Sequence, residues 1–596
     1  MLKKFFIAFM GSIAAIWLSA ILLMIVFIMS MAGIIASAFA SSSSTVSVDK
    51  HSILRIDLSG VIAERDEARE MQDMLMNGVD GTAETFESIM SAVRLAAKDK
   101  KIDGIFLNCE DASLGYASRE ELIEALKEFK NSGKWIYSYS GTYSQSDYYV
   151  ASVADEIYLN PVGMLEFRGL GTVIPFFKGA LDKLGVDVQV FKVGTFKSAV
   201  EPYLLTEISE PARMQTEVYL GSIWSTVRKT IAEARKVSAD SLNSYANEMV
   251  MCKPAQSILD LKLVTKLAYL PEVEDKMRSL TEVEKDDDLK YVSPTDYLSQ
   301  NKEYNKTVKK HIAVLYAFGD ITDNGKTGIS AADMVPEIMS LAMDEDVAGL
   351  VMRVNSGGGS AYASEQIWQA LEVFKSYDKP FYVSMGDYAA SGGYYISCGA
   401  DKIYADANTL TGSIGIFGLF PSGEKLFSDK LGVTTSTVTT NPNAAMGTIF
   451  KPLTTEQAAA MQRYVEDGYA TFTGRVAKGR EMALDSVLRI AEGRVWDGLT
   501  AKKIGLVDEI GSLQKAIKDM AANLGIDASD YADYPTIDHS PLESLIRAAG
   551  LNGTIPAAAI KVDGMTPAEV NRCLDEIKRL RAMSPIQARM EQIIIQ

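Results

Sequence analysis

An internal repeat constrains the fold of this chain more than any other feature. Residues 102–143 and 347–388 align without a gap at an offset of 245 (349 − 104), and "ADEIY" at 154–158 matches "ADKIY" at 400–404. In each copy an apolar run, a helical stretch and a second apolar run follow one another. Such alternation is typical of parallel α/β layers. The sequence therefore predicts two homologous α/β domains.

The repeat also suggests where the domains begin and end. A chain of 596 residues is too long for one core, and the polar stretch 284–310 is typical of a connection. We expect an N-terminal α/β domain over 46–300, a C-terminal α/β domain over 301–540 and a helical tail over 541–596. The elements expected in the two copies are strands at 105–107 and 350–352, helices at 120–130 and 365–375, and second strands at 135–139 and 381–384.

A long apolar run opens the chain. Residues 5–40 carry no charge and follow Lys3 and Lys4, and about 20 apolar residues cross a bilayer. Lysines before the run place the amino terminus in the cytoplasm. The alternative is a cleavable signal peptide, because Ala38-Phe39-Ala40 has the small residues of a cleavage site, but such a peptide has a shorter apolar region. We expect an anchor and a serine-rich linker within 1–45.

Charge and cysteine content exclude several classes of function. The formal net charge of −17 argues against nucleic acid, which requires a basic surface. The four cysteines are scattered without a CxxC pair, so no zinc site is indicated. The glycine-rich stretches 355–360 and 411–418 lack the Gly-Lys-Ser/Thr of a phosphate loop. We expect neither a metal nor a cofactor.

The two copies differ in one glycine-rich loop. The second copy has "NSGGGS" at 355–360 where the first has "EDASLG" at 110–115, so Ser113 and Leu114 stand in place of Gly358 and Gly359. Consecutive glycines after a strand let backbone N–H groups face a ligand closely. A tight turn is the alternative interpretation.

The copies also differ around an aligned serine. Ser391 lies in "AASGG", whereas its counterpart Ser146 lies in "SQSDY" beside Asp147. A nucleophilic serine at a strand-to-helix corner needs small neighbours. The sequence therefore predicts that Ser391 is a nucleophile and that Ser146 is a structural remnant, although an ordinary turn serine would also fit.

A nucleophilic serine needs a base. None of the three histidines, His51, His311 and His539, lies in a loop suited to a triad, which leaves a neutral lysine. Lys197 lies in "FKVGTFKSAVEPY" at 191–203, and the corresponding stretch of the second copy, 441–447, has no lysine. The first copy has a lysine and the second a serine with glycines, which predicts one composite site. A solvated surface lysine is the alternative.

These stretches carry a family resemblance. With "VGTFKSAVEP", "GDYAASGGYY", "TGSIGIFG" and "RVNSGGGSAYASE", the chain resembles the long form of the signal peptide peptidase A (protease IV) family over essentially its whole soluble part. These are bacterial membrane-anchored serine peptidases with a Ser–Lys dyad. The family usually has a proline where this chain has Gly357, and the two following glycines are kept.

The resemblance implies a site and a setting. The fold is expected to be of the Clp-protease/crotonase-like α/β type, with the nucleophile Ser391, the general base Lys197, the lysine-orienting Ser413, and the oxyanion donors Gly392 with Gly358 or Gly359. The expected substrates are remnant signal peptides and other apolar peptides. The expected assembly is a homotetramer anchored by one pass in the bacterial inner membrane, with its catalytic body on the periplasmic side.

Two other functions remain open at this point. A crotonase-like acyl-CoA enzyme would use similar glycine amides, and acyl-CoA binding would reveal it. A non-catalytic membrane scaffold would be unaffected by substitution of Lys197.

Overall fold

The computed structural model describes residues 48–65, 84–284, 287–302, 304, 309–325, 327–536 and 586–590. The predicted anchor at 5–40 lies outside these residues. Among the helices that are described, none is long and apolar enough to cross a membrane.

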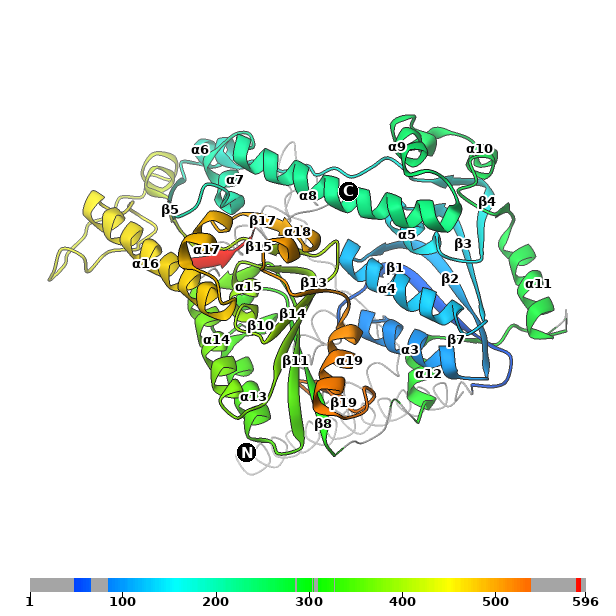
Figure 1. The fold of residues 1–596 in the computed structure, drawn as a ribbon. Coiled ribbons are helices and arrows are strands. Elements are labelled where there is room, and N and C mark those ends of the chain that lie inside the picture. The colour runs from blue at the N-terminus through cyan, green and yellow to red at the C-terminus, as the bar shows by residue number, and fades with distance from the viewer. Residues whose placement is uncertain are drawn as a thin grey trace, which may run out of the picture.

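The first copy is built on a parallel sheet of six strands, covered by helices (Figure 1). Its central strands are rich in Ile, Leu, Phe and Tyr, which favour a buried pleated surface. In spatial order the strands are β7 (Tyr291–Val292), β1 (Ser52–Val61), β2 (Ile102–Ser113), β3 (Trp135–Tyr143), β4 (Glu156–Leu165) and β6 (Lys266–Leu267).

The helices of the first copy include one that reaches the second. This helix, α8, starts after the N-cap Ser209 and runs along the top of the molecule in Figure 1. Gln215 on α8 accepts a hydrogen bond from the Val495 amide of the second copy at 3.1 Å. The helices are α3 (Phe86–Lys98), α4 (Tyr116–Lys130), α5 (Gln145–Ala151), α6 (Lys178–Leu184), α7 (Glu201–Leu204), α8 (Glu210–Arg235), α9 (Ala239–Asn247), α10 (Ala255–Asp260), α11 (Leu270–Thr281) and α12 (Pro294–Gln300), with short 3₁₀ turns at Ser198–Val200 and Val250–Cys252.

The second copy repeats this strand order. Its path β19-β8-β11-β13-β14-β18 corresponds to β7-β1-β2-β3-β4-β6, and β15 and β17 extend the sheet beside β13. The strands are β8 (His311–Phe318), β11 (Val347–Ser356), β13 (Phe381–Ala390), β14 (Lys402–Ala405), β15 (Leu410–Gly412), β17 (Val495–Asp497), β18 (Glu509–Ile510) and β19 (Tyr531–Tyr534). The helices are α13 (Ala331–Met343), α14 (Ala361–Lys375), α15 (Gly392–Ser397), α16 (Thr455–Gly479), α17 (Leu484–Ile490), α18 (Gly498–Lys503) and α19 (Leu513–Leu524), with a π-helical turn at Leu426–Lys430.

The strands and helices predicted at the start of each copy are therefore confirmed. The strands 105–107 and 350–352 lie in β2 and β11, and the helices 120–130 and 365–375 lie in α4 and α14. The second strands fall in β3 and β13.

A third sheet is shared by both copies. Its order is β10 (Ile329–Ser330), β9 (Ile321–Thr322), β12 (Gly358–Ser360), β20 (Ile586–Arg589), β16 (Phe417–Ser422) and β5 (Asp187–Lys192). Strand β5 comes from the first copy and pairs antiparallel with β16 of the second. This pairing places the end of β5, and the loop after it, inside the second copy.

The predicted helical tail needs a correction. Within 541–596 the structure describes residues 586–590, of which Ile586–Arg589 form the strand β20 and not a helix. The rest of the predicted tail lies outside the described residues. Local composition gave no sign of this strand because its partners β12 and β16 are about 230 and 170 residues away in the sequence. Such non-local pairing overrides local propensity.

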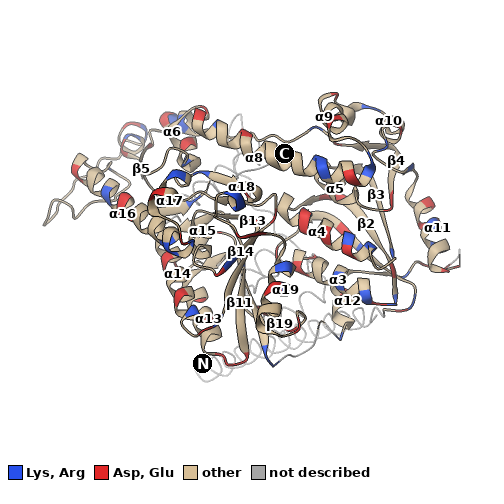
Figure 2. Ribbon diagram, in the orientation of Figure 1, with Lys and Arg blue, Asp and Glu red and all other residues tan. Residues whose placement is uncertain are grey.

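The cores of the two copies meet. One apolar cluster contains first-copy residues together with Ala390, Leu410 and Val495 of the second, and another contains second-copy residues together with Phe191 of the first. Charged residues lie mainly on the helices and loops around the sheets (Figure 2).

Candidate active site

Lys197 enters the second copy on the loop after β5. A Cβ atom at Gly493 would lie 2.7 Å from the Lys197 Cβ, so only glycine lets the two backbones approach this closely. The Phe196 amide donates to the Glu492 carbonyl at 2.9 Å. These contacts fix the backbone of the lysine against the second copy.

The lysine side chain contacts two serines of the second copy. Its Nζ lies 2.8 Å from Ser391 Oγ. It lies 3.1 Å from both the carbonyl oxygen and Oγ of Ser413. Lys197, Ser391 and Ser413 are 1%, 0% and 2% exposed. The structure therefore brings together the three side chains expected at the site, and Lys197 lies 194 and 216 residues before the two serines in the sequence.

Ser391 sits in a strained turn between β13 and α15. Its φ is 55° and its ψ is −112°, values that non-glycine residues rarely adopt. Its amide donates to the Gly412 carbonyl at 2.8 Å. A Cβ at Gly392 would lie 2.8 Å from Ser364 Oγ, and one at Gly393 would lie 2.6 Å from the Ser356 carbonyl oxygen. The small neighbours are thus required by the space around the turn.

The glycine loop lies beside this serine. Gly358 has a φ of 100°, and a Cβ there would lie 2.7 Å from the Gly392 amide nitrogen. Its own amide donates to Ser356 Oγ at 3.1 Å. Gly359 pairs with Ala588 of β20. Of the two glycines that the sequence left as alternatives, Gly358 therefore has its amide engaged within the loop, whereas Gly359 faces the neighbouring strand.

Cys398 on the far end of α15 is a packing residue. It is fully buried, and its Sγ donates to the Tyr395 carbonyl at 3.2 Å. Burial raises the pKa of the Cys398 thiol to about 12, so it stays protonated. Among the described residues, no group of His, Cys, Asp and Glu side chains is arranged to hold a metal ion.

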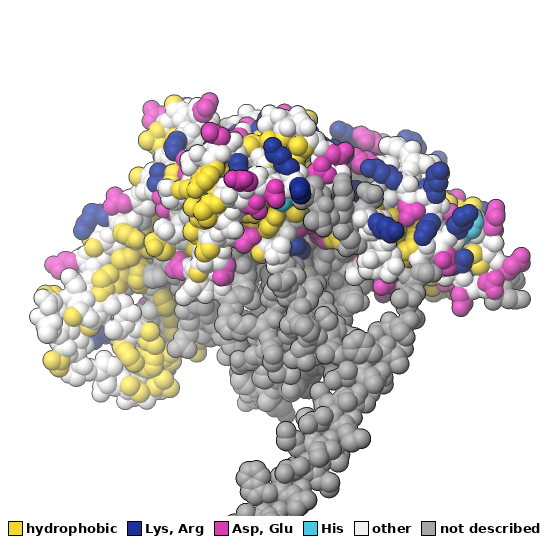
Figure 3. Space-filling model, turned by 90° about the horizontal axis from the view of Figure 1, so that it is seen from below, with side chains coloured by type: hydrophobic (Ala, Val, Ile, Leu, Met, Phe, Trp, Pro, Cys, Tyr) yellow, Lys and Arg dark blue, Asp and Glu magenta, His cyan; other side chains and the backbone are white. Residues whose placement is uncertain are grey.

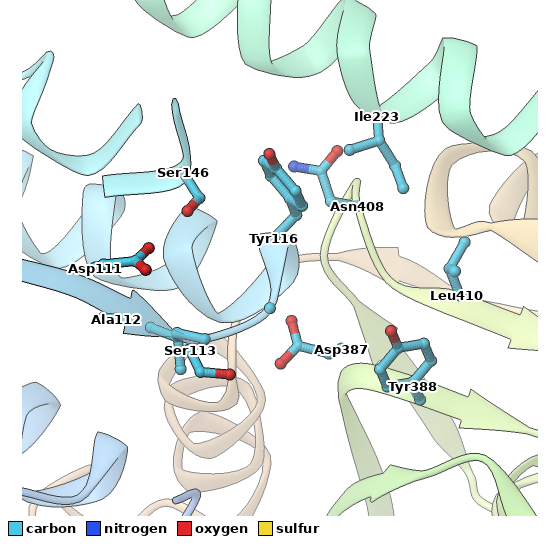
Figure 4. A pocket seen from close by; sticks show the side chains of 12 residues that line it. Asp111, Ala112, Ser113, Tyr116, Ser146, Ile223, Asp387, Tyr388, Asn408 and Leu410 are labelled. Atoms are coloured by element: carbon cyan, nitrogen blue, oxygen red, sulfur yellow. The ribbon is translucent and has the colours of Figure 1, made fainter. Parts of the chain in front are cut away.

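The equivalent place in the first copy is built differently. Ser146 lines a cavity of about 510 Å³ between the copies, together with Asp111 and Tyr116 of the first and Asp387 and Asn408 of the second (Figure 4). Ser146 Oγ lies 3.2 Å from Ser144 Oγ. None of the described residues that line this cavity is a lysine.

Asp147 holds the loop of the first copy closed. Its Oδ2 accepts from the amides of Asp111 and Ala112 at 2.9 and 3.2 Å. Its Oδ1 accepts from Arg119 Nη2 at 2.9 Å, and both side chains are 1% exposed. Burial raises the pKa of Asp147, and the charge of Arg119 partly offsets this rise.

Two features of the site were missed by sequence reasoning. Gly493 supports Lys197 but lies in "AEGRV" at 491–495, which has no counterpart in a motif. Asp387, four residues before Ser391, accepts from the Ala117 and Ser118 amides of the first copy at 3.0 Å each. An uncapped glycine at the start of α4, Gly115, was the only local signal of that contact.

Comparison with known proteins identifies the family of this chain. The model of Peptidase family S49 matches the chain twice, over residues 128–284 and 373–527. Protease 4 of Haemophilus influenzae is 36% identical over 509 residues, which cover 82% of each chain. Protease 4 of Salmonella typhi is 34% identical over 88% of this chain and 86% of its own. The chloroplastic serine protease SPPA of Arabidopsis thaliana is 28% identical over 79% of this chain and 69% of its own.

A solved structure of a ClpP1 mutant from Listeria monocytogenes matches 34% of this chain and 92% of its own, with 15% identity and a TM-score of 0.23. That score is too low to define the fold.

These matches define the protein as a serine peptidase. The chain belongs to peptidase family S49, in the long form with two tandem copies, and the resemblance seen in its motifs is confirmed.

Proposed function

We propose that the protein is a membrane-anchored serine endopeptidase that degrades remnant signal peptides and other apolar peptides through a dyad of Ser391 and Lys197. The observation that carries the proposal is the 2.8 Å contact between Lys197 Nζ and Ser391 Oγ, made by buried side chains from different copies. A lysine at this distance can take the serine proton directly.

The first half of the proposed reaction acylates the serine. Lys197, as the neutral amine, removes the proton from Ser391 Oγ while the oxygen attacks the peptide carbonyl carbon. Burial disfavours the ammonium form, and the Ser413 hydroxyl and carbonyl oxygens at 3.1 Å orient the amine. The ammonium then gives its proton to the leaving amine of the cleaved peptide.

The second half releases the acyl group. Water attacks the ester at Ser391 with Lys197 again acting as base, and the serine regains its proton. The oxyanion of each tetrahedral intermediate would bind the amides of Gly359 and Gly392. Gly358, with its φ of 100°, turns the loop so that only backbone atoms of the loop line the proposed oxyanion site. Preorganised amides of this kind stabilise the developing charge without reorganisation.

An exposed apolar surface next to the third sheet supports the proposal that the substrates are apolar peptides. The segment 431–450, which follows β16, exposes large apolar side chains, and they gather on the left-hand part of the molecule in Figure 3. Exposed apolar patches commonly mark sites of peptide or membrane contact. The exposed residues are Leu431, Val433, Val438, Met446, Ile449 and Phe450.

The proposal extends to the setting that the family resemblance implies. The protein would form a homotetramer, anchored by residues 5–40 in the bacterial inner membrane with the catalytic body in the periplasm. Sedimentation in detergent, and protease accessibility of intact against opened spheroplasts, would test these two statements.

Hydrolysis of a fluorogenic apolar peptide by the detergent-solubilised protein tests the dyad. We expect Ser391→Ala to be inactive and Lys197→Ala to lose about 10²–10⁴-fold in kcat. The matched controls are Ser146→Ala at the aligned serine and Lys183→Ala on the exposed face of α6, both of which should keep wild-type activity. Circular dichroism and sedimentation would establish that each variant is folded and assembled.

The outcome that contradicts the dyad is specific. If Lys197→Ala keeps full activity while Ser391→Ala is dead, another group is the base. If Ser391→Ala also keeps its activity, the nucleophile lies elsewhere, and a loss in Ser146→Ala would place it in the first copy.

A further inference from the structure

One side chain of the first copy holds both neighbours of Lys197. Gln215, on the helix α8, is 1% exposed. Its Nε2 donates to the Phe196 carbonyl oxygen at 3.2 Å and to Ser198 Oγ at 3.1 Å. Phe196 and Ser198 are the residues directly before and after the lysine. A single amide nitrogen therefore fastens the backbone on both sides of Lys197.

The other end of the same amide binds the second copy. Gln215 Oε1 accepts a hydrogen bond from the Val495 amide at 3.1 Å. Val495 begins β17 and lies two residues after Gly493, which packs on the Lys197 backbone. Between them, the Arg494 carbonyl oxygen accepts from the Ser413 amide at 2.7 Å. Gln215 therefore ties the lysine loop to the segment that also holds Ser413.

A carboxylate attaches the lysine loop to α8 at a second point. Glu201 is 5% exposed, and it accepts from the Ser209 amide at 3.1 Å and from Ser209 Oγ at 2.6 Å. Ser209 is the N-cap of α8, and Gln215 lies about 9 Å further along the helix. The segment between Lys197 and Ser209 is thus held to one helix at both of its ends.

The contacts of Gln215 require a side chain that both donates and accepts. A primary amide has two N–H donors and a carbonyl acceptor. A carboxylate at this place could accept from Val495 but could not donate to Phe196, and a thioether or hydrocarbon would leave both backbone groups unpaired. Buried backbone groups do not stay unpaired without cost. The loop would therefore shift to find other partners.

We infer that Gln215 is a positioning residue of the peptidase, which keeps Lys197 Nζ within reach of Ser391 Oγ by tying the lysine backbone to the second copy. The inference rests on the proposed Ser391–Lys197 dyad. Gln215 acts through the backbone and not on the reacting atoms. Proton transfer depends on the 2.8 Å contact of the dyad, and a displacement of about 1 Å can lower a rate about 10²-fold.

Steady-state kinetics of the detergent-solubilised full chain test this role. With a fluorogenic apolar peptide, Gln215→Glu and Gln215→Met should lower kcat about 10–10²-fold and change KM by less than about twofold. Thr216→Val is the matched control, since Thr216 is buried beside Gln215 but its Oγ1 donates to the Ala212 carbonyl within α8. It should keep wild-type kcat. A wild-type kcat in both Gln215 variants, or a rise in KM alone, would overturn the inference.

A milder variant covers the case in which the Gln215 variants fail to fold. Ser198→Ala removes one of the two acceptors and leaves the bond to Phe196 in place. It should lower kcat about two- to fivefold with unchanged KM, as expected for one neutral hydrogen bond. A wild-type kcat in this variant would contradict the positioning role.

A double variant separates failure of this inference from failure of the dyad. If Gln215 acts through the lysine, adding Gln215→Met to Lys197→Ala should lower the residual kcat by less than about twofold. A further loss of about tenfold would mean that Gln215 acts by another route, and it would overturn the inference. If Lys197→Ala is impaired while Gln215→Met keeps wild-type kcat, the inference fails and the dyad stands. If Lys197→Ala itself keeps full activity, the dyad fails and the inference fails with it.

Discussion

The two copies of the α/β domain share one strand order and use it in opposite ways. In the second copy the loop after β11 contains three glycines, so this loop puts no side chain beside Ser391. In the first copy the loop after β2 binds the carboxylate of Asp147, which accepts from two of the loop amides. The same backbone corner is thus lined by backbone in one copy and filled by the chain's own side chain in the other.

A single pair of positions accounts for this difference. Arg119 and Asp147 of the first copy align with Ser364 and Gly392 of the second at the offset of 245. The large buried ion pair fills the first corner. The two small residues pack against each other in the second. The first corner is therefore filled by a buried ion pair, whereas the second corner holds only small residues.

The copies also complete one another. Lys197 of the first copy reaches Ser391 of the second, and Asp387 of the second caps helix α4 of the first. Neither contact can form within one copy. The comparison predicts that the two copies respond differently to substitution, and four pairs of variants, each with a matched control, test this in order of size.

The largest effect, on stability, is expected at the buried Arg119–Asp147 ion pair of the first copy. Asp147→Asn should lower the free energy of unfolding by about 3–5 kcal/mol, because it leaves Arg119 buried without its charged partner. Urea unfolding measures this. Asp182→Asn, which breaks the exposed pair with Lys178, should cost about 0.5 kcal/mol or less. A loss of kcat in Asp147→Asn under conditions where it is folded would show that the first corner is not merely structural.

The next effect concerns the open corner of the second copy. Gly358→Ser introduces the residue found at the aligned position 113, and its Cβ would stand 2.1 Å from the Ala588 carbonyl oxygen and 2.7 Å from the Gly392 amide nitrogen. We expect kcat to fall by about 10²–10³-fold, as for loss of an oxyanion donor. Gly357→Ala also copies the first copy, but a Cβ there has no atom within 4 Å. It should keep wild-type kcat, and equal losses in both variants would contradict the assigned geometry.

These contrasts show what the sequence could predict. The repeat predicted both α/β domains, because the periodicity of strands and helices is a local property of the sequence. It also pointed to Ser391, the glycines and Lys197, because the two copies could be compared residue by residue. The contact between Gly493 and Lys197 and the cap supplied by Asp387 could not be predicted, because each joins segments that are distant in the sequence. Strand β20 was predicted as part of a helical tail, since its partners lie in other parts of the chain.

A smaller effect is expected at the contact that caps α4. The N-cap of α4 is Gly115, which has no side chain, whereas Asp387 accepts from the amides of Ala117 and Ser118 across the copies. Asp387→Ala should lower the free energy of unfolding by about 1 kcal/mol, and it should also lower kcat/KM, because the dyad joins the same two copies. Ser238→Ala removes the N-cap of α9 within one copy. It should cost similar stability without changing kcat/KM, and identical kinetics in the two variants would show that the cap does not align the dyad.

The smallest effect concerns two aligned glutamates, Glu120 and Glu365, whose substitution should change the stability at high pH in opposite directions. Glu120 on α4 is half-buried against the second copy, where it accepts from the Asn408 amide at 3.1 Å. Burial raises its pKa from 4.5 to about 7, and neighbouring carboxylates add to the rise. Its counterpart Glu365 on α14 instead binds Arg475 at 2.6 Å.

The raised pKa makes the folded protein bind the Glu120 proton more tightly than the unfolded chain. Between pH 4.5 and about 7 the folded state therefore holds more protons, and stability falls as pH rises through this window. Glu120→Gln removes that fall while keeping an acceptor for Asn408. Relative to wild type, the variant should gain on the order of 1 kcal/mol in free energy of unfolding between pH 5 and pH 8.

Glu365→Gln should instead lose about 0.2–1 kcal/mol of free energy of unfolding at pH 8, because Arg475 loses its partner. Urea unfolding at both pH values measures the two differences, and a Glu120→Gln curve that stays parallel to wild type would mean that this carboxyl is already paired or hydrated across the copies.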